Sequence, residues 1–133
     1  MKQQIKIIKI IHLAFCLGLI VAYLIIGDIK ALTSFSFDVI NSSNMIFLFI
    51  PIIAIILSEF LFKSQLKTMD SKLSLENKMP FYQRASIIRW AVLEGATFLI
   101  LFLNKDYIIF GIFIIVYFIF IRPTEDKIKM TLV

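Results

Sequence analysis

The sequence predicts an all-α membrane protein with four transmembrane helices in an antiparallel bundle and both termini in the cytoplasm. Three observations predict this class. Apolar residues fill 60% of the 133 positions, and the mean hydropathy is +0.94. They form long runs, most of them within the about 17–25 residues that cross a hydrocarbon core of about 30 Å. Basic residues gather at the ends of these runs, where they orient membrane proteins.

The predicted spans are residues 6–26, 45–62, 84–103 and 107–121. The first is longer than the apolar region of a signal peptide and has no small-x-small cleavage site after it, so we expect a retained anchor. The third is the least hydrophobic, because Arg89 and Glu94 lie within it. The fourth is short, so Tyr107 and Arg122 are expected to anchor its ends at the membrane interfaces. These spans leave no room for a second domain, so residues 1–133 form one unit.

The segment between the second and third spans has helical character. Leu66, Met69 and Leu73 recur at helical spacing among lysines, so the segment either extends the second span or lies on the lipid surface. Pro80 is expected in the first turn of the third helix, and Pro123 is expected to end the fourth.

Loop charges predict the orientation. The N-terminus, the loop after the second span and the C-terminal tail hold nearly all basic residues, whereas the other two loops hold only Lys30 and Lys105. Cytoplasmic loops carry this excess, so both termini are expected on the cytoplasmic side of the membrane. Small exporters and fluoride channels that insert in both orientations need balanced loop charges, which this chain lacks. The basic residues that give the net charge of +5 lie at the ends of the apolar runs, where they would contact anionic lipid headgroups. Nucleic acid is therefore not an expected partner.

The sequence favours no enzyme class. It has one histidine and one cysteine, Cys16, so it lacks a disulfide pair and the spacing of a metal site. No Gly-rich phosphate loop or nucleophile elbow is present either. Glu59 with His12 is the one acid and base pair that a membrane hydrolase could use. We therefore expect no catalytic residue, cofactor or metal.

Depth along the spans predicts a polar layer. Four side chains fall roughly 5 to 8 Å inside the cytoplasmic edge, counted from the flanking basic residues: His12, Glu59, Arg89 and Tyr117. An Arg89–Glu59 ion pair with His12 and Tyr117 as hydrogen-bonding neighbours would satisfy charges that lipid cannot solvate. The favoured interpretation is a structural lock between helices, and the alternative is a working site.

Glu94 lies deeper, about 15 Å from that edge and near the midplane. It follows Arg89 by five residues, which places it about 140° around the helix, so the two do not form a favourable i, i+4 pair. We expect a hydrogen bond to Tyr23, Thr97 or a carbonyl freed by Pro51. A neutral structural carboxyl and a proton-exchanging one remain open.

Small residues recur every fourth position in two spans. Residues 10–18 align weakly with 87–95, which leaves open either a parallel internal repeat or chance similarity between apolar helices. Such small residues let helix backbones approach closely. We expect them to pack inside the bundle, and the alternative is a contact between two protomers. The two stripes are Ala14, Gly18 and Ala22 in the first span and Ala91 and Gly95 in the third.

Two segments carry a family resemblance: Ile-Ile-Arg-Trp-Ala-Val-Leu-Glu-Gly-Ala at 87–96 and Ile-Arg-Pro-Thr-Glu-Asp-Lys at 121–127. On these the chain resembles small four-helix inner-membrane proteins of unassigned function from Bacteroidota, mainly in its C-terminal half. The resemblance implies an inner-membrane protein and no activity.

The leading hypothesis is an accessory or oligomeric subunit that acts through helix contacts. Its expected partners are the lipid bilayer and a second copy or another membrane protein. The alternative is a small proton- or ion-coupled carrier or channel that uses Glu94.

Overall fold

The computed structural model describes residues 2–27, 45–103 and 108–132, and the regular secondary structure within these ranges is all helical. The helices are α1 (Lys2–Ile26), α3 (Ile46–Leu66), α4 (Leu75–Leu103), α5 (Ile108–Phe120) and α6 (Glu125–Leu132). Local sequence explains where two of them begin. Ser74 caps α4 by accepting the backbone N–H of Asn77 on its hydroxyl at 3.3 Å, and Thr124 caps α6 by accepting that of Lys127 at 3.2 Å.

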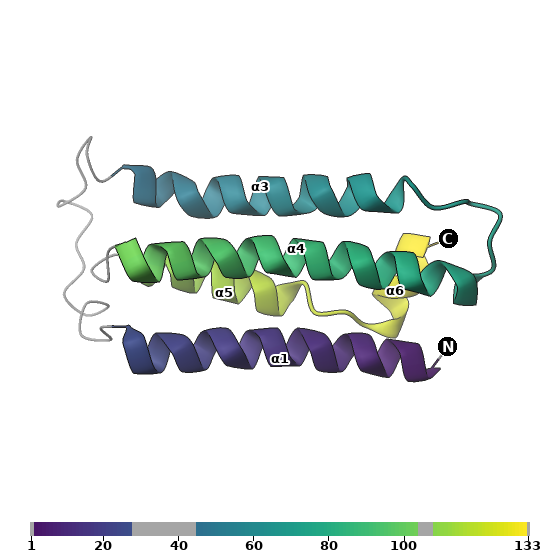
Figure 1. Ribbon diagram of the computed structural model, residues 1–133, viewed down its shortest axis with the longest axis horizontal. Coiled ribbons are helices and arrows are strands. Elements are labelled where there is room, and N and C mark those ends of the chain that lie inside the picture. The colour runs from purple at the N-terminus through teal and green to yellow at the C-terminus, as the bar shows by residue number, and fades with distance from the viewer. Residues whose placement is uncertain (1, 28–44, 104–107, 133) are drawn as a thin grey trace.

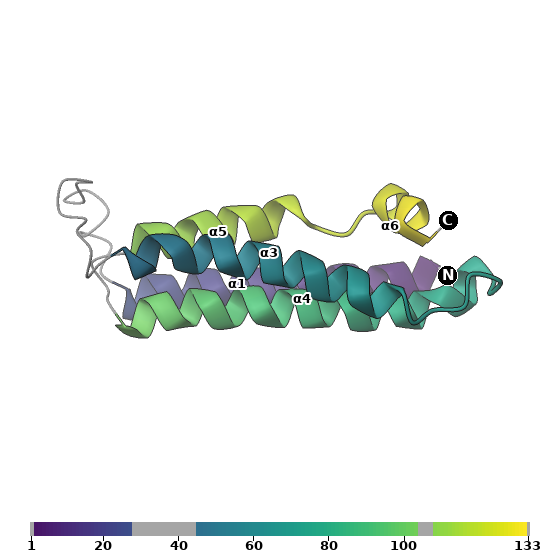
Figure 2. The same ribbon diagram turned by 90° about the horizontal axis from the view of Figure 1, so that it is seen from above.

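Four of these helices form a bundle, and α6 lies at one end of it (Figures 1 and 2). In Figure 1, α1 and α3 lie on opposite sides of α4 and α5. In Figure 2, α4 and α5 lie on opposite sides of α1 and α3. Each of α1 and α3 contacts both α4 and α5, and α4 also contacts α5. The N-terminus, the α3–α4 connection and α6 share one end of the bundle (Figure 1).

Helix length and composition make this a multi-pass, all-α membrane protein. Three helices, α1, α3 and α4, are each long and apolar enough to cross a bilayer. The fourth predicted span differs from expectation. α5 has only 13 residues, or about 20 Å, and passes the same test only together with α6, from which it is bent by 81°. Tyr107, expected to anchor its start, lies outside the described residues.

Two sequence expectations about the inner segments need correction. α4 begins at Leu75, well before the expected residue 84, so Pro80 lies inside the helix rather than in its first turn. Pro80 removes the hydrogen bond that residue 80 would donate to the Glu76 carbonyl, and the exposure of both residues lets water reach that carbonyl. α6 was not predicted at all. It forms because Ile128 and Leu132 are buried, and because Lys78 Nζ donates to the Leu132 carbonyl at 2.8 Å.

The bundle core is apolar and rich in large side chains, among them Trp90, Phe110 and Phe118, each at most 1% exposed. Tyr23 of α1 crosses this core and donates its hydroxyl to the Thr97 carbonyl of α4 at 2.6 Å. Gly111 of α5 makes room for the Tyr23 ring, since a Cβ built there would overlap the Tyr23 hydroxyl. A glycine is therefore required where α5 approaches α1.

Gly111→Ala should destabilise the bundle, with Gly18→Ala as the matched control. Both changes gain the same helix propensity, about 1 kcal/mol. Only Gly111→Ala overpacks the core, which typically costs about 1–3 kcal/mol, because nothing lies within 4 Å of a Cβ at Gly18. Thermal unfolding in mild detergent should rank Gly111→Ala below wild type and Gly18→Ala level with it or above. Equal unfolding of the two variants would contradict the α1–α5 packing.

Candidate functional site

Three helices meet at one carboxylate. Glu59 of α3 accepts a hydrogen bond on Oε1 from Arg89 Nη1 of α4 at 3.1 Å and another from the Tyr117 hydroxyl of α5 at 2.7 Å. The sequence predicted the Arg89–Glu59 pair, and the structure contains it. Helix packing brings the three together, because α3 and α5 both lie against α4. The contact ties α3, α4 and α5 through one shared acceptor.

Burial makes this cluster energetically important. Arg89 is 8% exposed, whereas the Glu59 side chain is 34% exposed. The guanidinium also lies over the Phe62 ring, with its central carbon 3.8 Å from the ring centroid. This cation–π contact was not predicted, although Phe62 lies three residues after Glu59 and thus on the same side of α3. Arg89 therefore has both a charge partner and an aromatic partner on α3.

Arg89 also retains an unused donor. Its Nε is buried without a hydrogen-bond partner among the described residues. A hollow of about 310 Å³ adjoins Arg89, between the bundle and α6, and Tyr82, Lys127 and Thr131 help to line it. Lys127 Nζ caps the C-terminal end of α5 by donating to the Phe120 carbonyl at 3.0 Å, and it also donates to the Arg122 carbonyl just beyond that helix at 3.3 Å. Water in this hollow would reach the guanidinium without breaking the ion pair.

His12 does not take its expected place beside the ion pair. Its Nε2 donates to the Phe118 carbonyl of α5 at 2.8 Å, one of the last carbonyls of a helix, which lack intrahelical partners. Its ring packs against Trp90 and Phe118, with centroids 5.1 Å apart in both cases, and Cys16 Sγ lies 3.7 Å from Nε2. His12 therefore caps α5. Depth counting gave its level correctly but not the side of α1 on which it lies.

Glu94 does not bond to the partners expected for it. Tyr23 donates to the Thr97 carbonyl, and Thr97 Oγ1 donates to the Leu93 carbonyl at 2.6 Å, so both hydroxyls are used elsewhere. Glu94 itself is intermediate in exposure, and no hydrogen bond or ion pair to it occurs within the described part of the chain. It lies on the flank of α4 instead of in the core.

The small-residue stripes also face away from the core, contrary to the expected packing inside the bundle. Ala14, Gly18, Ala91 and Gly95 are exposed, and Ala22 is intermediate. A Cβ built on Gly18 or Gly95 would meet no atom within 4 Å. Periodicity alone could not give the direction, because α1 carries large side chains on both sides: Leu19 and Tyr23 are buried, whereas Leu13 and Leu17 are exposed.

In chemical terms the Glu59 cluster stabilises charge and does not activate a nucleophile. Its carboxylate is occupied by Arg89 and Tyr117, and His12 binds a carbonyl elsewhere. Within residues 2–27, 45–103 and 108–132, no three His, Cys, Asp or Glu side chains are grouped as metal ligands. The cluster is therefore suited to holding three helices in register.

A double-mutant cycle should detect the ion pair. Removing one partner of a buried pair leaves the other charge uncompensated, which typically costs about 3–5 kcal/mol. Glu59→Gln should therefore destabilise, and adding Arg89→Gln should recover much of the loss. Tyr117→Phe is the control, because it removes one hydrogen bond to a charged group, about 1.5–3 kcal/mol, and leaves the pair intact. Additive losses in unfolding free energy for Glu59→Gln and Arg89→Gln would contradict the coupling.

Comparison with known proteins adds no relative. Neither a protein-family model, a curated protein nor a solved structure matches this chain. The resemblance to Bacteroidota membrane proteins stays a prediction. The functional argument therefore depends on the geometry of the chain itself.

Proposed function

We propose that the chain is a small subunit of the bacterial inner membrane that acts by docking a transmembrane helix of a second polypeptide. In this proposal it crosses the membrane four times as an antiparallel bundle with both termini in the cytoplasm, in keeping with its loop charges. The docking face is the outer surface of α1 and α4. We define this α1–α4 face by Ala14, Gly18, Ala91, Glu94 and Gly95.

The observation that carries the proposal is the open space outside Gly18 and Gly95. Small residues at four-residue spacing let helices approach closely in lipid, where van der Waals contact drives association. Here that spacing is not used inside the protein, because Ala14, Gly18, Ala91 and Gly95 are all exposed. The backbone of a neighbouring helix would therefore be able to approach closely at two rows of small residues, one on α1 and one on α4.

The two rows of small residues lie on helices that contact each other, α1 and α4. Trp90 precedes Glu94 by one turn and so shares its side of α4, and the Trp90 ring centroid is 6.0 Å from that of Phe15 on α1. Glu94 therefore lies on the side of α4 that faces α1. A polar group in lipid without a partner is costly, and a helix that supplied a hydrogen bond to Glu94 would remove that cost. Such interhelical bonds contribute about 0.6–2 kcal/mol.

The same carboxyl supports a second candidate, a proton- or ion-coupled carrier or channel. What favours it is that Glu94 is partly exposed and has no partner among the described residues. A carboxyl in that position would be free to exchange a proton with a bound ion or water. The helix-docking proposal is preferred because it also accounts for Gly18 and Gly95, which the carrier proposal leaves unused.

Gly18→Leu and Gly95→Leu should weaken the complex, because a large side chain blocks close approach of the docked helix. Val116→Phe is the matched control, since Val116 is 44% exposed on α5, away from the α1–α4 face. Crosslinking and pull-down from native membranes, with fluorescence energy transfer between two labelled copies, should show roughly tenfold weaker association for both glycine variants. Unchanged association in both would rule out the α1–α4 face.

Glu94→Gln separates the two candidates. The amide keeps the shape and the hydrogen-bonding capacity, so a docked helix should stay bound. If Glu94 exchanges protons, the variant should instead keep its fold and partner but lose proton or ion flux in reconstituted vesicles. Flux in wild type that Glu94→Gln abolishes would favour the carrier over the docking subunit.

A further inference from the structure

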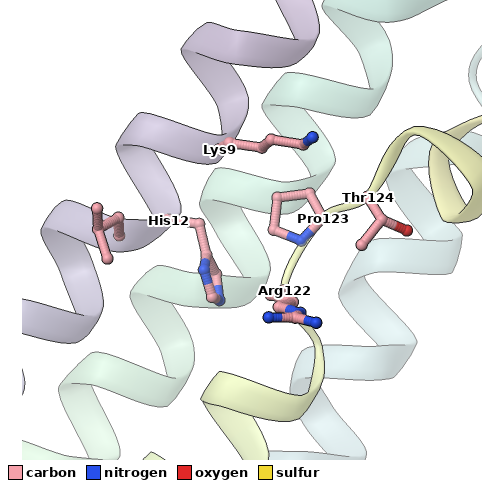
Figure 3. A pocket seen from close by; sticks show the side chains of 6 residues that line it. Lys9, His12, Arg122, Pro123 and Thr124 are labelled. Carbon is pink, nitrogen blue, oxygen red and sulfur yellow. The ribbon is translucent and has the colours of Figure 1, made fainter.

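A basic hollow opens between α1 and the linker that joins α5 to α6 (Figure 3). Its volume is about 420 Å³, within the about 300–1,000 Å³ of pockets that hold small ligands. In Figure 3, Lys9 and His12 reach from α1 toward the linker. The hollow belongs neither to the Glu59 cluster nor to the α1–α4 face. Its lining residues are Lys9, His12, Leu13, Arg122, Pro123 and Thr124.

Two positive charges in the hollow lack a counterion. Lys9 and Arg122 are both exposed, and neither forms an ion pair in the described part of the chain. Glu125, at the start of α6, is already paired, since Lys129 Nζ lies 2.9 Å from its carboxylate. The Lys129 ammonium holds the pKa of Glu125 below its usual range, with a smaller contribution from Lys9. The hollow therefore carries a net positive charge that suits an anion.

The depth of the hollow follows from the shortness of α5. Its 13 residues span about 20 Å. If α5 starts at one face of a hydrocarbon core of about 30 Å, it therefore ends about 10 Å before the other face. Arg122 comes two residues after that end. Lys9 is also recessed, about 10 Å along α1 from Lys2. Both cations thus lie inside the level where α1 begins, and a polar group must reach inward to meet them.

An apolar track leads from the hollow along α1. Leu13 and Leu17 follow Lys9 at four-residue spacing, so the three share one side of the helix. They are 56% and 53% exposed, and Leu24, further along the same side, is 60% exposed. A cationic site next to an exposed apolar strip complements a phospholipid, which has an anionic headgroup and apolar acyl chains. A free phosphate ion would contact only the cations and not the apolar strip.

We infer that this hollow binds the phosphate of an anionic phospholipid headgroup, with Lys9 and Arg122 neutralising the charge and an acyl chain lying along Leu13 and Leu17. Thr124 also lines the hollow, and its hydroxyl accepts the Lys127 backbone N–H at 3.2 Å. Basic pockets between membrane helices suit anionic headgroups. The inference does not depend on the α1–α4 face.

The test is a lipid titration of the purified protein in neutral detergent, read by native mass spectrometry. Phosphatidylglycerol should bind, and phosphatidylcholine should bind much less. Lys9→Gln with Arg122→Gln should weaken phosphatidylglycerol binding about 30-fold, or roughly fivefold for each cation removed near the membrane surface. Lys67→Gln with Lys72→Gln is the charge-matched control, because both lysines are exposed in or next to the α3–α4 connection; this control should bind like wild type.

Two further arms make the outcome decisive. Lys9→Arg with Arg122→Lys keeps both charges and should retain binding within about threefold, so a folding defect in the glutamine pair does not block the test. Millimolar inorganic phosphate should not displace the lipid. Displacement by inorganic phosphate would overturn the assignment to a lipid. Equal loss in the Lys67 and Lys72 control, or wild-type binding by the glutamine pair, would overturn the site.

Discussion

Lipid offers no hydrogen bond to a buried polar group, and this constraint governs the bundle. The Arg89 guanidinium is stabilised in an apolar helix by its ion pair with Glu59 and its cation–π contact with Phe62, both on α3. Tyr117 of α5 donates to the same Glu59 carboxylate. Removing one side chain of this cluster leaves the charge of another unpaired, which destabilises more than replacing both charged residues with apolar ones. A single carboxylate on α3 therefore links α4 and α5, in addition to the apolar packing of the three helices.

The same constraint explains how α5 ends. The last carbonyls of a helix lack intrahelical partners, and in the proposed four-span arrangement those of the short α5 lie where water is scarce, so the chain must supply donors. His12 donates to the Phe118 carbonyl, while Lys127 donates to those of Phe120 and Arg122. These contacts attach α1 and α6 to the end of α5. They also leave Arg122 and Lys9 beside a hollow that an anion can enter.

Sequence reasoning found the helices and the ion pair but not the direction of several side chains. Apolar length predicts the three long helices α1, α3 and α4, and depth counting places Arg89 level with Glu59, because both depend only on rise per residue. The fourth span is not confirmed in the same way, because α5 passes as a span only together with α6. Which way Gly18 and Gly95 face depends on which flank of each helix meets its neighbour, and that follows from packing larger residues such as Trp90 and Phe118. α6 was missed because its buried positions, Ile128 and Leu132, are too few to form a periodic pattern.

In the proposed topology the short α5 completes a fourth crossing, so that α6 and the α3–α4 connection lie together on the cytoplasmic side. Labelling with a membrane-impermeant maleimide tests it most directly, with single cysteines introduced by Ser36→Cys, Ser71→Cys or Thr131→Cys in a Cys16→Ala background. The account predicts that Ser36→Cys reacts in intact cells and that the other two react only after the cytoplasmic side is opened. Reaction of Thr131→Cys from outside, with Ser71→Cys protected, would contradict the fourth crossing and with it the four-span bundle.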